Sequence, residues 1–132
     1  MIFRILLLAL LTSIPTVQVK KQPQQPKMKF QATYFKMGTY SASERPVRKM
    51  VYVFTNEGKE PLLITEVKIG CPCTKVRYTK HPVQHGEKGY VDVFYDSKYF
   101  PPGHVNKSIG IRSNGLKPYD FAYLTFEGDT TK

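Results

Sequence analysis

The sequence lacks the short motifs that mark common catalytic and nucleic-acid-binding sites. It has no G-x-S-x-G elbow, no H-E-x-x-H pair, no Walker loop and no closely spaced acidic pair suited to acid–base catalysis. It also has no zinc-finger, helix-turn-helix or RNP-like motif. We therefore expect a protein that is not an enzyme, that needs no cofactor and that does not bind nucleic acid.

Long apolar runs and sustained helical patterns are missing as well. The most apolar stretch, residues 5–17, is shorter than the ~20 residues that a membrane-spanning helix needs. Beyond it, no segment keeps a helical spacing of apolar residues for three turns. Short apolar runs bounded by glycine, proline or asparagine recur instead, at intervals of roughly 8 to 15 residues. This pattern predicts an all-β fold.

The N-terminus has the features of an export signal. Arg4 provides a positive charge, residues 5–11 are apolar without interruption, and Pro15 ends any helix. We therefore expect export to the periplasm or the extracellular space, with contact to a membrane only if the leader stays uncleaved as a tether. The expected order is a leader, a linker rich in Gln, Pro and Lys, and one folded domain, at residues 1–22, 23–27 and 28–132.

Acidic residues are scarce. The chain has 10 Asp and Glu against 20 Lys and Arg, a net charge of +10, which falls to +7 when residues 1–22 are removed. Such a charge attracts acidic glycans, anionic lipids and other polyanions without choosing among them. Lys75 and Arg77 lie two residues apart and would share one face of a strand. The candidate polyanion-binding residues are Lys75, Arg77, Lys80 and Lys88.

Seven strands are predicted, the number in an immunoglobulin-like β-sandwich. The clearest spans residues 47–55, where Met50, Tyr52 and Phe54 project to one face. A turn follows in which Gly58 can take a positive φ, and the next strand, residues 62–69, forms a hairpin with the first or a corner between two sheets. The other strands are expected within residues 28–34, 74–78, 89–95, 107–113 and 119–127.

Several short motifs follow one another in an order that resembles a known bacterial family. An F-x-N-x-G turn is followed by P-L-x-I and C-x-C-T, and then by glycines, a Y-D pair and S-N. In this respect the chain is similar to the family catalogued as domain of unknown function 1573, from about residue 35 to residue 128. The resemblance implies an immunoglobulin-like fold related to assembly modules of larger proteins. The matching positions include Phe54, Asn56, Gly58, Pro61, Leu62, Thr74, Gly86, Gly89 and Asp96.

The only two cysteines, Cys71 and Cys73, flank Pro72, where the resembling family usually has glycine. Proline lacks a backbone donor, so this segment is expected at an edge, a bulge or a turn. A disulfide here closes a loop of three residues and would stabilise the fold by only ~1.6 kcal/mol. The pair is therefore structural, a labile redox pair, or part of a Cu or Zn site whose candidate third ligands are His81, His85 and His104.

These features lead to one functional hypothesis and two alternatives. We expect an exported, non-catalytic immunoglobulin-like module of the bacterial cell envelope whose sheet face or edge strand binds a protein or a glycan. The first alternative is thiol redox chemistry or soft-metal binding through the cysteines. The second is polyanion binding through a basic face, which predicts affinity that falls steeply with salt.

Overall fold

The computed structural model of the protein describes residues 13–18 and 24–132. Most of the predicted leader lies outside the described residues. Within the described residues, no helix is long and apolar enough to cross a membrane. The strands are β1 (Met28–Phe30), β2 (Tyr34–Ser41), β3 (Val47–Asn56), β4 (Ile64–Lys68), β5 (Thr74–Tyr78), β6 (Lys88–Asp96), β7 (Gly103–Ser113) and β8 (Ala122–Thr131), with a 3-10 helix, η1 (Ser97–Tyr99), after β6.

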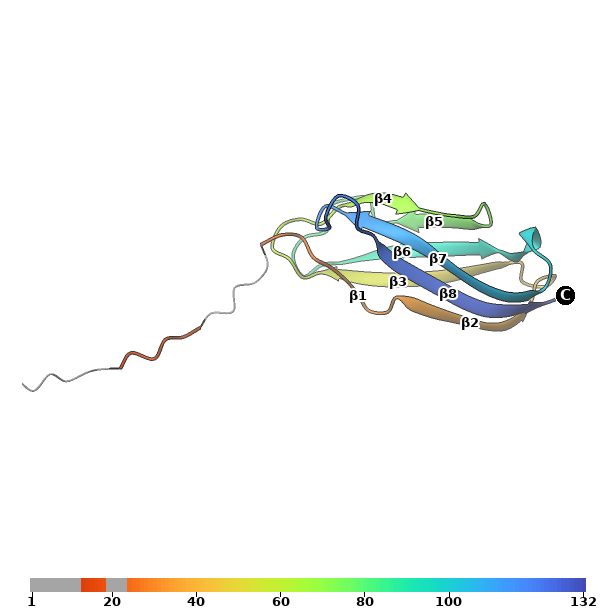
Figure 1. Ribbon diagram of the computed structural model, residues 1–132, viewed down its shortest axis with the longest axis horizontal. Coiled ribbons are helices and arrows are strands. Elements are labelled where there is room, and N and C mark those ends of the chain that lie inside the picture. Colours follow the sequence, from red (N-terminus) through yellow and green to blue (C-terminus); the bar gives the residue numbers. More distant parts are fainter. Residues whose placement is uncertain (1–12, 19–23) are drawn as a thin grey trace, which may run out of the picture.

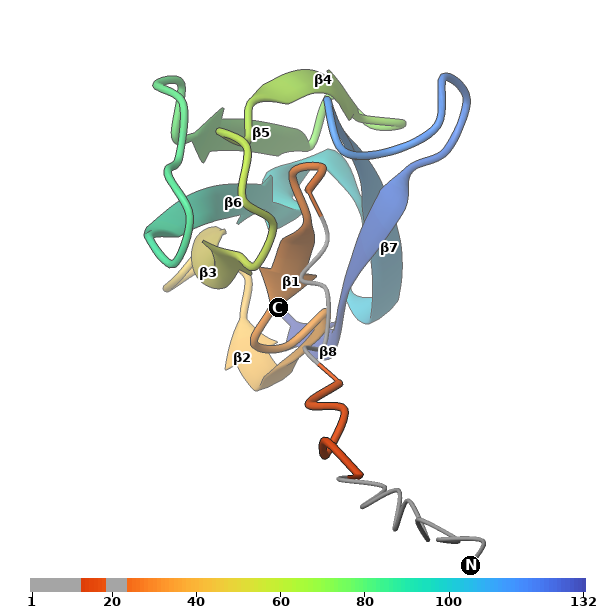
Figure 2. The same ribbon diagram turned by 90° about the vertical axis from the view of Figure 1, so that its left-hand side faces the viewer.

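Two four-stranded sheets pack face to face as a β-sandwich (Figures 1 and 2). Sheet A has the order β1-β3-β6-β5 and sheet B the order β2-β8-β7-β4. Neighbours are antiparallel except β2 and β8, which are parallel. These orders match the two sheets of an immunoglobulin constant domain, with β2 as an additional strand alongside the last one. The predicted all-β, immunoglobulin-like sandwich is confirmed, with eight described strands.

The core lies between the sheets, as the alternation along β3 predicted. Met50, Tyr52 and Phe54 are all buried, while the residues between them face outward. The hydroxyl of Tyr52 donates a hydrogen bond of 2.7 Å to the carbonyl oxygen of Thr125 in β8, which joins the two sheets. Burial raises the pKa of the Tyr52 phenol above its ordinary value. Ile109, Ile111, Leu124 and Phe126 fill the facing side from sheet B.

The connection from β3 to β4 is a corner between the sheets, because β3 belongs to sheet A and β4 to sheet B. Leu62 lies before β4 and forms an isolated bridge with Val83 rather than a continuous strand. Within β4 the register shifts between Ile64 and Glu66. The strand is therefore shorter than the predicted residues 62–69.

The structure also differs from the predicted strands near the N-terminus. Residues 28–34 were expected to hold one strand, whereas β1 ends at Phe30 in sheet A and β2 begins at Tyr34 in sheet B. Gly38 interrupts β2 with a φ of 72° at a shift in its register with β8. This irregularity breaks the alternation by which a strand is recognised in sequence.

Contacts of the folded domain begin before Met28. The amide of Glu60 donates to the carbonyl of Gln24 at 3.1 Å, and the amide of Glu57 donates to that of Lys27 at 2.8 Å. Pro26 is buried. Residues 24–27 of the predicted linker therefore lie against the domain.

Candidate functional site

The residues that carry the family resemblance are concentrated in the turn after β3. Asn56 is fully buried there, and its side chain makes four hydrogen bonds. Its oxygen accepts from the amides of Lys27 and Gly58, and its nitrogen donates to the carbonyls of Glu60 and Val83, all at 2.8–3.1 Å. Every donor and acceptor of this side chain is occupied by backbone. Asn56 therefore organises the turn and is not free to bind a ligand.

Two family-motif glycines serve close packing. A Cβ at Gly58 would fall on the carbonyl oxygen of Gln25, and one at Gly89 would fall on the ring of Phe54. Gly58 does not have a positive φ, so the predicted reason for this glycine is wrong. The backbone of Gln25 and the ring of Phe54 occupy these spaces, and only a residue without a side chain leaves them free. Gly86, by contrast, has a φ of 77° in the turn before β6.

The remaining motif positions also support the fold. Leu62 is fully buried, and the carbonyl of Pro61 accepts a hydrogen bond from the side chain of Asn114. Thr74 is buried at the start of β5. Asp96 caps η1 by accepting from the amide of Lys98 at 3.1 Å. The family motifs of this chain are therefore a set of turn and packing residues.

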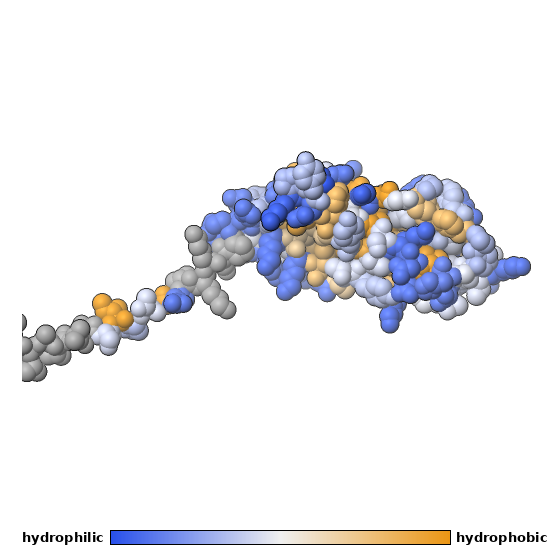
Figure 3. Space-filling view, in the orientation of Figure 1, coloured by the Kyte–Doolittle hydropathy of each residue, from blue (hydrophilic) through white to orange (hydrophobic). Residues whose placement is uncertain are grey.

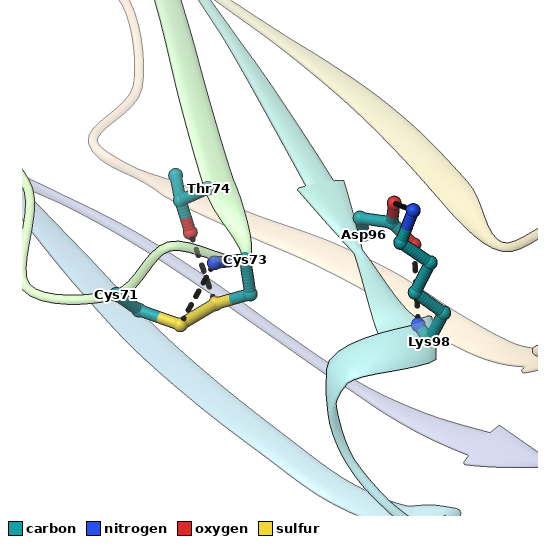
Figure 4. Close-up of a disulfide and its surroundings, with 5 residues drawn as sticks. All are labelled: Cys71, Cys73, Thr74, Asp96 and Lys98. Atoms are coloured by element: carbon teal, nitrogen blue, oxygen red, sulfur yellow. Dashed lines mark hydrogen bonds and ion pairs between the residues drawn. A yellow bond between two sulfur atoms is a disulfide. The ribbon is translucent and has the colours of Figure 1, made fainter.

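The Cys71–Pro72–Cys73 segment forms a turn immediately before β5, as expected from Pro72 (Figure 4). The cysteines form a disulfide with Cα atoms 5.2 Å apart. Cys73 is buried and its carbonyl accepts from the amide of Asp96 at 2.7 Å, whereas Cys71 is only half-buried. Cys71 is therefore the more exposed residue of the pair.

An open hollow of about 390 Å³ lies beside this turn. It runs from Pro72 and Cys73 along β5 to the end of β6 and to η1. Its walls combine apolar side chains with three cations and one carboxylate, and they include Val47, Val76, Phe94, Tyr99, Lys75, Arg77, Lys98 and Asp96. Such a mixture suits a ligand with both apolar and acidic groups.

The four candidate polyanion-binding residues do not form one patch. Lys75 and Arg77 project from β5 on the outer face of sheet A, opposite Phe94 and Asp92 of β6. Lys88 lies at the other end of β6, six residues from Phe94, which corresponds to about 20 Å of strand. Lys80 lies beyond β5, with its ammonium 5.7 Å from the ring centre of Tyr78.

A buried carboxylate on the outer face of sheet A was not identified from the sequence. Asp92 is 5% exposed and lies under Arg77 and Lys49, at 3.3 and 3.7 Å. Both cations also lie over the ring of Phe94, at about 5.7 and 5.8 Å from its centre. The alternation in residues 88–96, which places Tyr90, Asp92 and Phe94 on one face, is the sequence signal that points to this cluster.

The three histidines are distributed over different parts of the described chain. The Nδ1 atom of His85 lies 2.7 Å from the carbonyl oxygen of Gly58, at the turn organised by Asn56. His104 lies on sheet B between Asp129 and Glu127, each at 3.0 Å. His81 is exposed after β5. Among residues 13–18 and 24–132, no group of three or more His, Cys, Asp and Glu side chains is arranged to hold a metal ion.

The two outer faces of the sandwich differ in chemistry. The outer face of sheet A carries an apolar strip that includes Val47, Val51, Tyr90 and Phe94, with cations between them. Along β7 and β8, the outer face of sheet B presents Asn106, Ser108, Thr125 and Glu127, together with the exposed ring of Tyr123. Figure 3 has the orientation of Figure 1, in which β7 and β8 lie in front, and it shows apolar side chains exposed between hydrophilic ones on this side as well. Sheet A therefore combines exposed apolar side chains with cations on its outer face.

The strand orders and the buried core define a β-sandwich of the immunoglobulin-like and PapD-like class. The sequence matches the family described as "Protein of unknown function (DUF1573)" over residues 28–129. The chain belongs to this family, as its motifs indicated. A search of curated proteins found no match.

Solved structures with a similar fold share little sequence with this chain. A protein of unknown function from Porphyromonas gingivalis W83 is 15% identical, with a TM-score of 0.66 over 86% of this chain and 51% of that one. The PapD-like domain 7 of human CEP192 is 11% identical, with a TM-score of 0.61 over 92% and 96%. The periplasmic chaperone SfaE is 6% identical, with a TM-score of 0.57 over 80% and 59%.

These similarities concern the fold alone. The chain spans about half the length of the Porphyromonas gingivalis protein. The fold also forms part of an enzyme, because the Vibrio cholerae VesB protease matches 82% of this chain over 32% of its own length, at 15% identity and a TM-score of 0.54.

Proposed function

We propose that this protein is an exported, non-catalytic module of the bacterial cell envelope that binds another protein through the outer face of sheet A. The observation that carries the proposal is the apolar strip on that face, where Val51 and Tyr90 are 47% and 41% exposed and where Val47 and Phe94 also line the hollow at the Cys71 turn. Exposed apolar side chains that lie together, with cations around them, are typical of protein-binding surfaces. Export is supported by the sequence of the leader.

The motif residues support this assignment indirectly. Asn56, Gly58 and Gly89 are committed to turns and packing, and the Asn56 side chain has no hydrogen-bonding group left for catalysis. The outer face of sheet A is built from other positions, so it can vary without loss of the fold. This is the arrangement expected of a scaffold that presents a binding face.

Site-specific photocrosslinking in the native envelope tests the proposal. A photoreactive residue at Val51 should capture a distinct partner protein, whereas the same residue at Tyr123, which is 59% exposed on sheet B, should not. Capture of nothing from Val51, or of the same proteins from both positions, would refute binding through sheet A. Capture of a glycan would redirect the proposal to a carbohydrate partner. Turnover of a substrate in a broad hydrolase and oxidoreductase screen would refute the non-catalytic assignment.

A second candidate function is a redox-sensitive disulfide between Cys71 and Cys73, next to the hollow described above. Cys73, the disulfide partner of the half-buried Cys71, lines the hollow together with three cations. Nearby cations stabilise a thiolate and so favour exchange with a soluble thiol. Alkylation after equilibration in graded glutathione buffers measures the reduction potential. A potential near that of the glutathione pool would support a redox role, and one below about −300 mV would identify a structural bond.

A further inference from the structure

Strand β5 is an open edge that is suited to pairing with another strand. It pairs with β6 alone. Hydrogen bonds from Asp96 to Cys73 and from Thr79 to Tyr90 bracket it, at 2.7 and 3.1 Å. Backbone groups alternate in direction along an antiparallel strand, so Val76 and Tyr78 direct their N–H and C=O groups away from β6. These groups have no strand partner in the described part of the chain.

The other three edges of the two sheets are less suited to pairing. Strand β1 has only three residues, and β2 and β4 each contain a register shift, at Lys36/Gly38 and Ile64/Glu66. Short strands and bulges protect an edge from further pairing, and so do charged side chains such as Lys75 and Arg77, which disfavour pairing with a neutral or basic strand. The register of β5 with β6 is continuous over all five of its residues. Strand β5 is therefore the regular edge among those described.

The charges around β5 define which strand can bind there. Lys75 and Arg77 lie on its outer side, and Lys80 follows it. No Asp or Glu occurs between Glu66 and Glu87 in the sequence. A neutral or basic strand would leave these cations unpaired or repelled, whereas acidic residues directly opposite them gain an attraction. Arg77 keeps 64% of its side chain exposed despite its contact with Asp92.

The inner side of the same edge is apolar. Val76 and Tyr78 are half-buried, and together with Val67 of β4 they pack against the margin of the core. Figures 1 and 2 both place β4 and β5 on the same side of the sandwich. Alternate side chains of an added strand would point inward here, so apolar residues at those positions would extend the core.

We propose that the β5 edge binds an extended acidic segment of a partner protein, which adds to sheet A as a further strand. This inference rests on the proposed function and names the chemistry of the partner. Acidic residues of the segment face Lys75 and Arg77, and apolar residues face Val76 and Tyr78. A second copy of this chain is a poor occupant, because a two-fold pairing centred on Val76 places Lys75 opposite Arg77.

The probe is a short synthetic peptide of alternating valine and glutamate, blocked at both ends. It should bind the domain, and binding should slow the amide hydrogen exchange of Val76 and Tyr78. A Val/Lys peptide should not bind, and N-methylation of every second residue on the pairing side should weaken binding by about tenfold or more, because the backbone hydrogen bonds are lost. Equal affinity of the N-methylated peptide would exclude strand addition.

Charge reversal tests the role of the cations. The variant Lys75→Glu/Lys80→Glu should weaken peptide binding by about tenfold or more, since two attractions become repulsions. Lys117→Glu/Lys132→Glu changes the net charge equally at exposed positions away from β5 and should leave affinity unchanged. Equal losses of peptide affinity in both variants would show that only the net charge of the protein matters, and this would refute a specific site.

The outcomes separate this inference from the proposed function. A protein that captures a partner through Val51 but does not bind the Val/Glu peptide refutes strand addition and leaves the binding function intact. A protein that captures no partner refutes the binding function itself. Concentration-dependent dimers that protect the amides of Val76 and Tyr78 without peptide would assign the edge to a second copy and overturn the acidic partner.

Discussion

The turn around Asn56 and the edge at β5 lie in the same domain but use their residues differently. Around Asn56, the side chain and its backbone partners are fully hydrogen-bonded, and Gly58 leaves no spare space. At β5, backbone groups of Val76 and Tyr78 have no strand partner in the described chain. The comparison shows that the residues that identify the family build the scaffold. The surface suited to binding is built largely from other residues.

Both kinds of residue, those that support the fold and those that line a surface suited to binding, occur around the Cys71 turn. Thr74 and Asp96 are motif residues that fix the start of β5 and the end of β6. Lys75 and Tyr99, which line the adjoining hollow, are not among the motif positions. Substitutions on each side of this boundary should therefore affect different properties, stability on one side and binding on the other.

The largest effect is expected from Phe54→Ala. The ring is fully buried and lies against Gly89 and Phe30. Its removal should lower the free energy of unfolding by ~3 to 5 kcal/mol, because transfer energy is lost and a cavity remains. Denaturant unfolding measures the change. A loss below ~1 kcal/mol would contradict the burial of this side chain.

A loss of about 2 to 3 kcal/mol is expected from Asn56→Ala. The substitution leaves two amides and two carbonyls without their side-chain partner, and some of them regain a bond to water. Asn114→Ala is the matched control, because Asn114 makes two similar bonds at an exposed position, and it should cost about 1 kcal/mol or less. Equal losses in the two variants would remove the contrast between the packed turn and the exposed surface.

A smaller effect is expected from Cys71→Ser/Cys73→Ser. The three-residue loop gives the disulfide at most ~1.6 kcal/mol of stabilisation. The wild type should therefore change little in stability between oxidising and reducing buffers, and the double variant should not change at all. A redox-dependent difference well above ~2 kcal/mol in wild type alone would make the disulfide the main covalent staple of the fold.

Tyr52→Phe should cost about 1 kcal/mol at neutral pH through the lost hydrogen bond to Thr125. Burial raises the pKa of Tyr52 in the folded state, so the unfolded chain loses this proton first as the pH rises above ~10. The contribution of Tyr52 is thus complete below that pH and is lost in alkali. The free energy of unfolding, measured across alkaline pH, should therefore fall less steeply in Tyr52→Phe than in the wild type. An unchanged slope would contradict the shifted pKa.

The smallest effect on stability is expected from Lys75→Glu. Lys75 is exposed at the open edge, so the free energy of unfolding should change by no more than ~0.5 kcal/mol. Binding to the Val/Glu peptide should nevertheless weaken. Thermal unfolding and peptide titration on the same sample separate the two properties. A loss of stability as large as that of Asn56→Ala would show that Lys75 is needed for the fold itself, which would contradict its assignment to the binding surface.

Several elements were predictable because their signals are local. The alternation from Val47 onward places Met50, Tyr52 and Phe54 in the core, and β5 has the predicted bounds Thr74–Tyr78. Pro72 correctly excludes a central strand for the cysteines, because proline removes a donor wherever it lies. The family motifs also carry the fold, since their spacing reflects turns formed by residues close in sequence.

Other elements depend on contacts that no local pattern records. Strand β2 pairs with β8, about ninety residues away, and its alternation is interrupted at Gly38. The role of Gly58 was misread because a positive φ is a local property, whereas the approach of Gln25 is not. The same holds for Asp92, which is covered by Lys49 from β3 and by Arg77 from β5.

The sequence by itself therefore determined the class of fold, the family and the position of the cysteines, because turn chemistry and two-residue alternation are written in neighbouring residues. Only the tertiary structure decided which edges are closed and which cations lie together. It places β2 along β8, leaves β5 as the regular open edge, and separates Lys75 and Arg77 from Lys88. These outcomes follow from the pairing of strands that are distant in sequence, and such pairing is settled by the packing of the whole core.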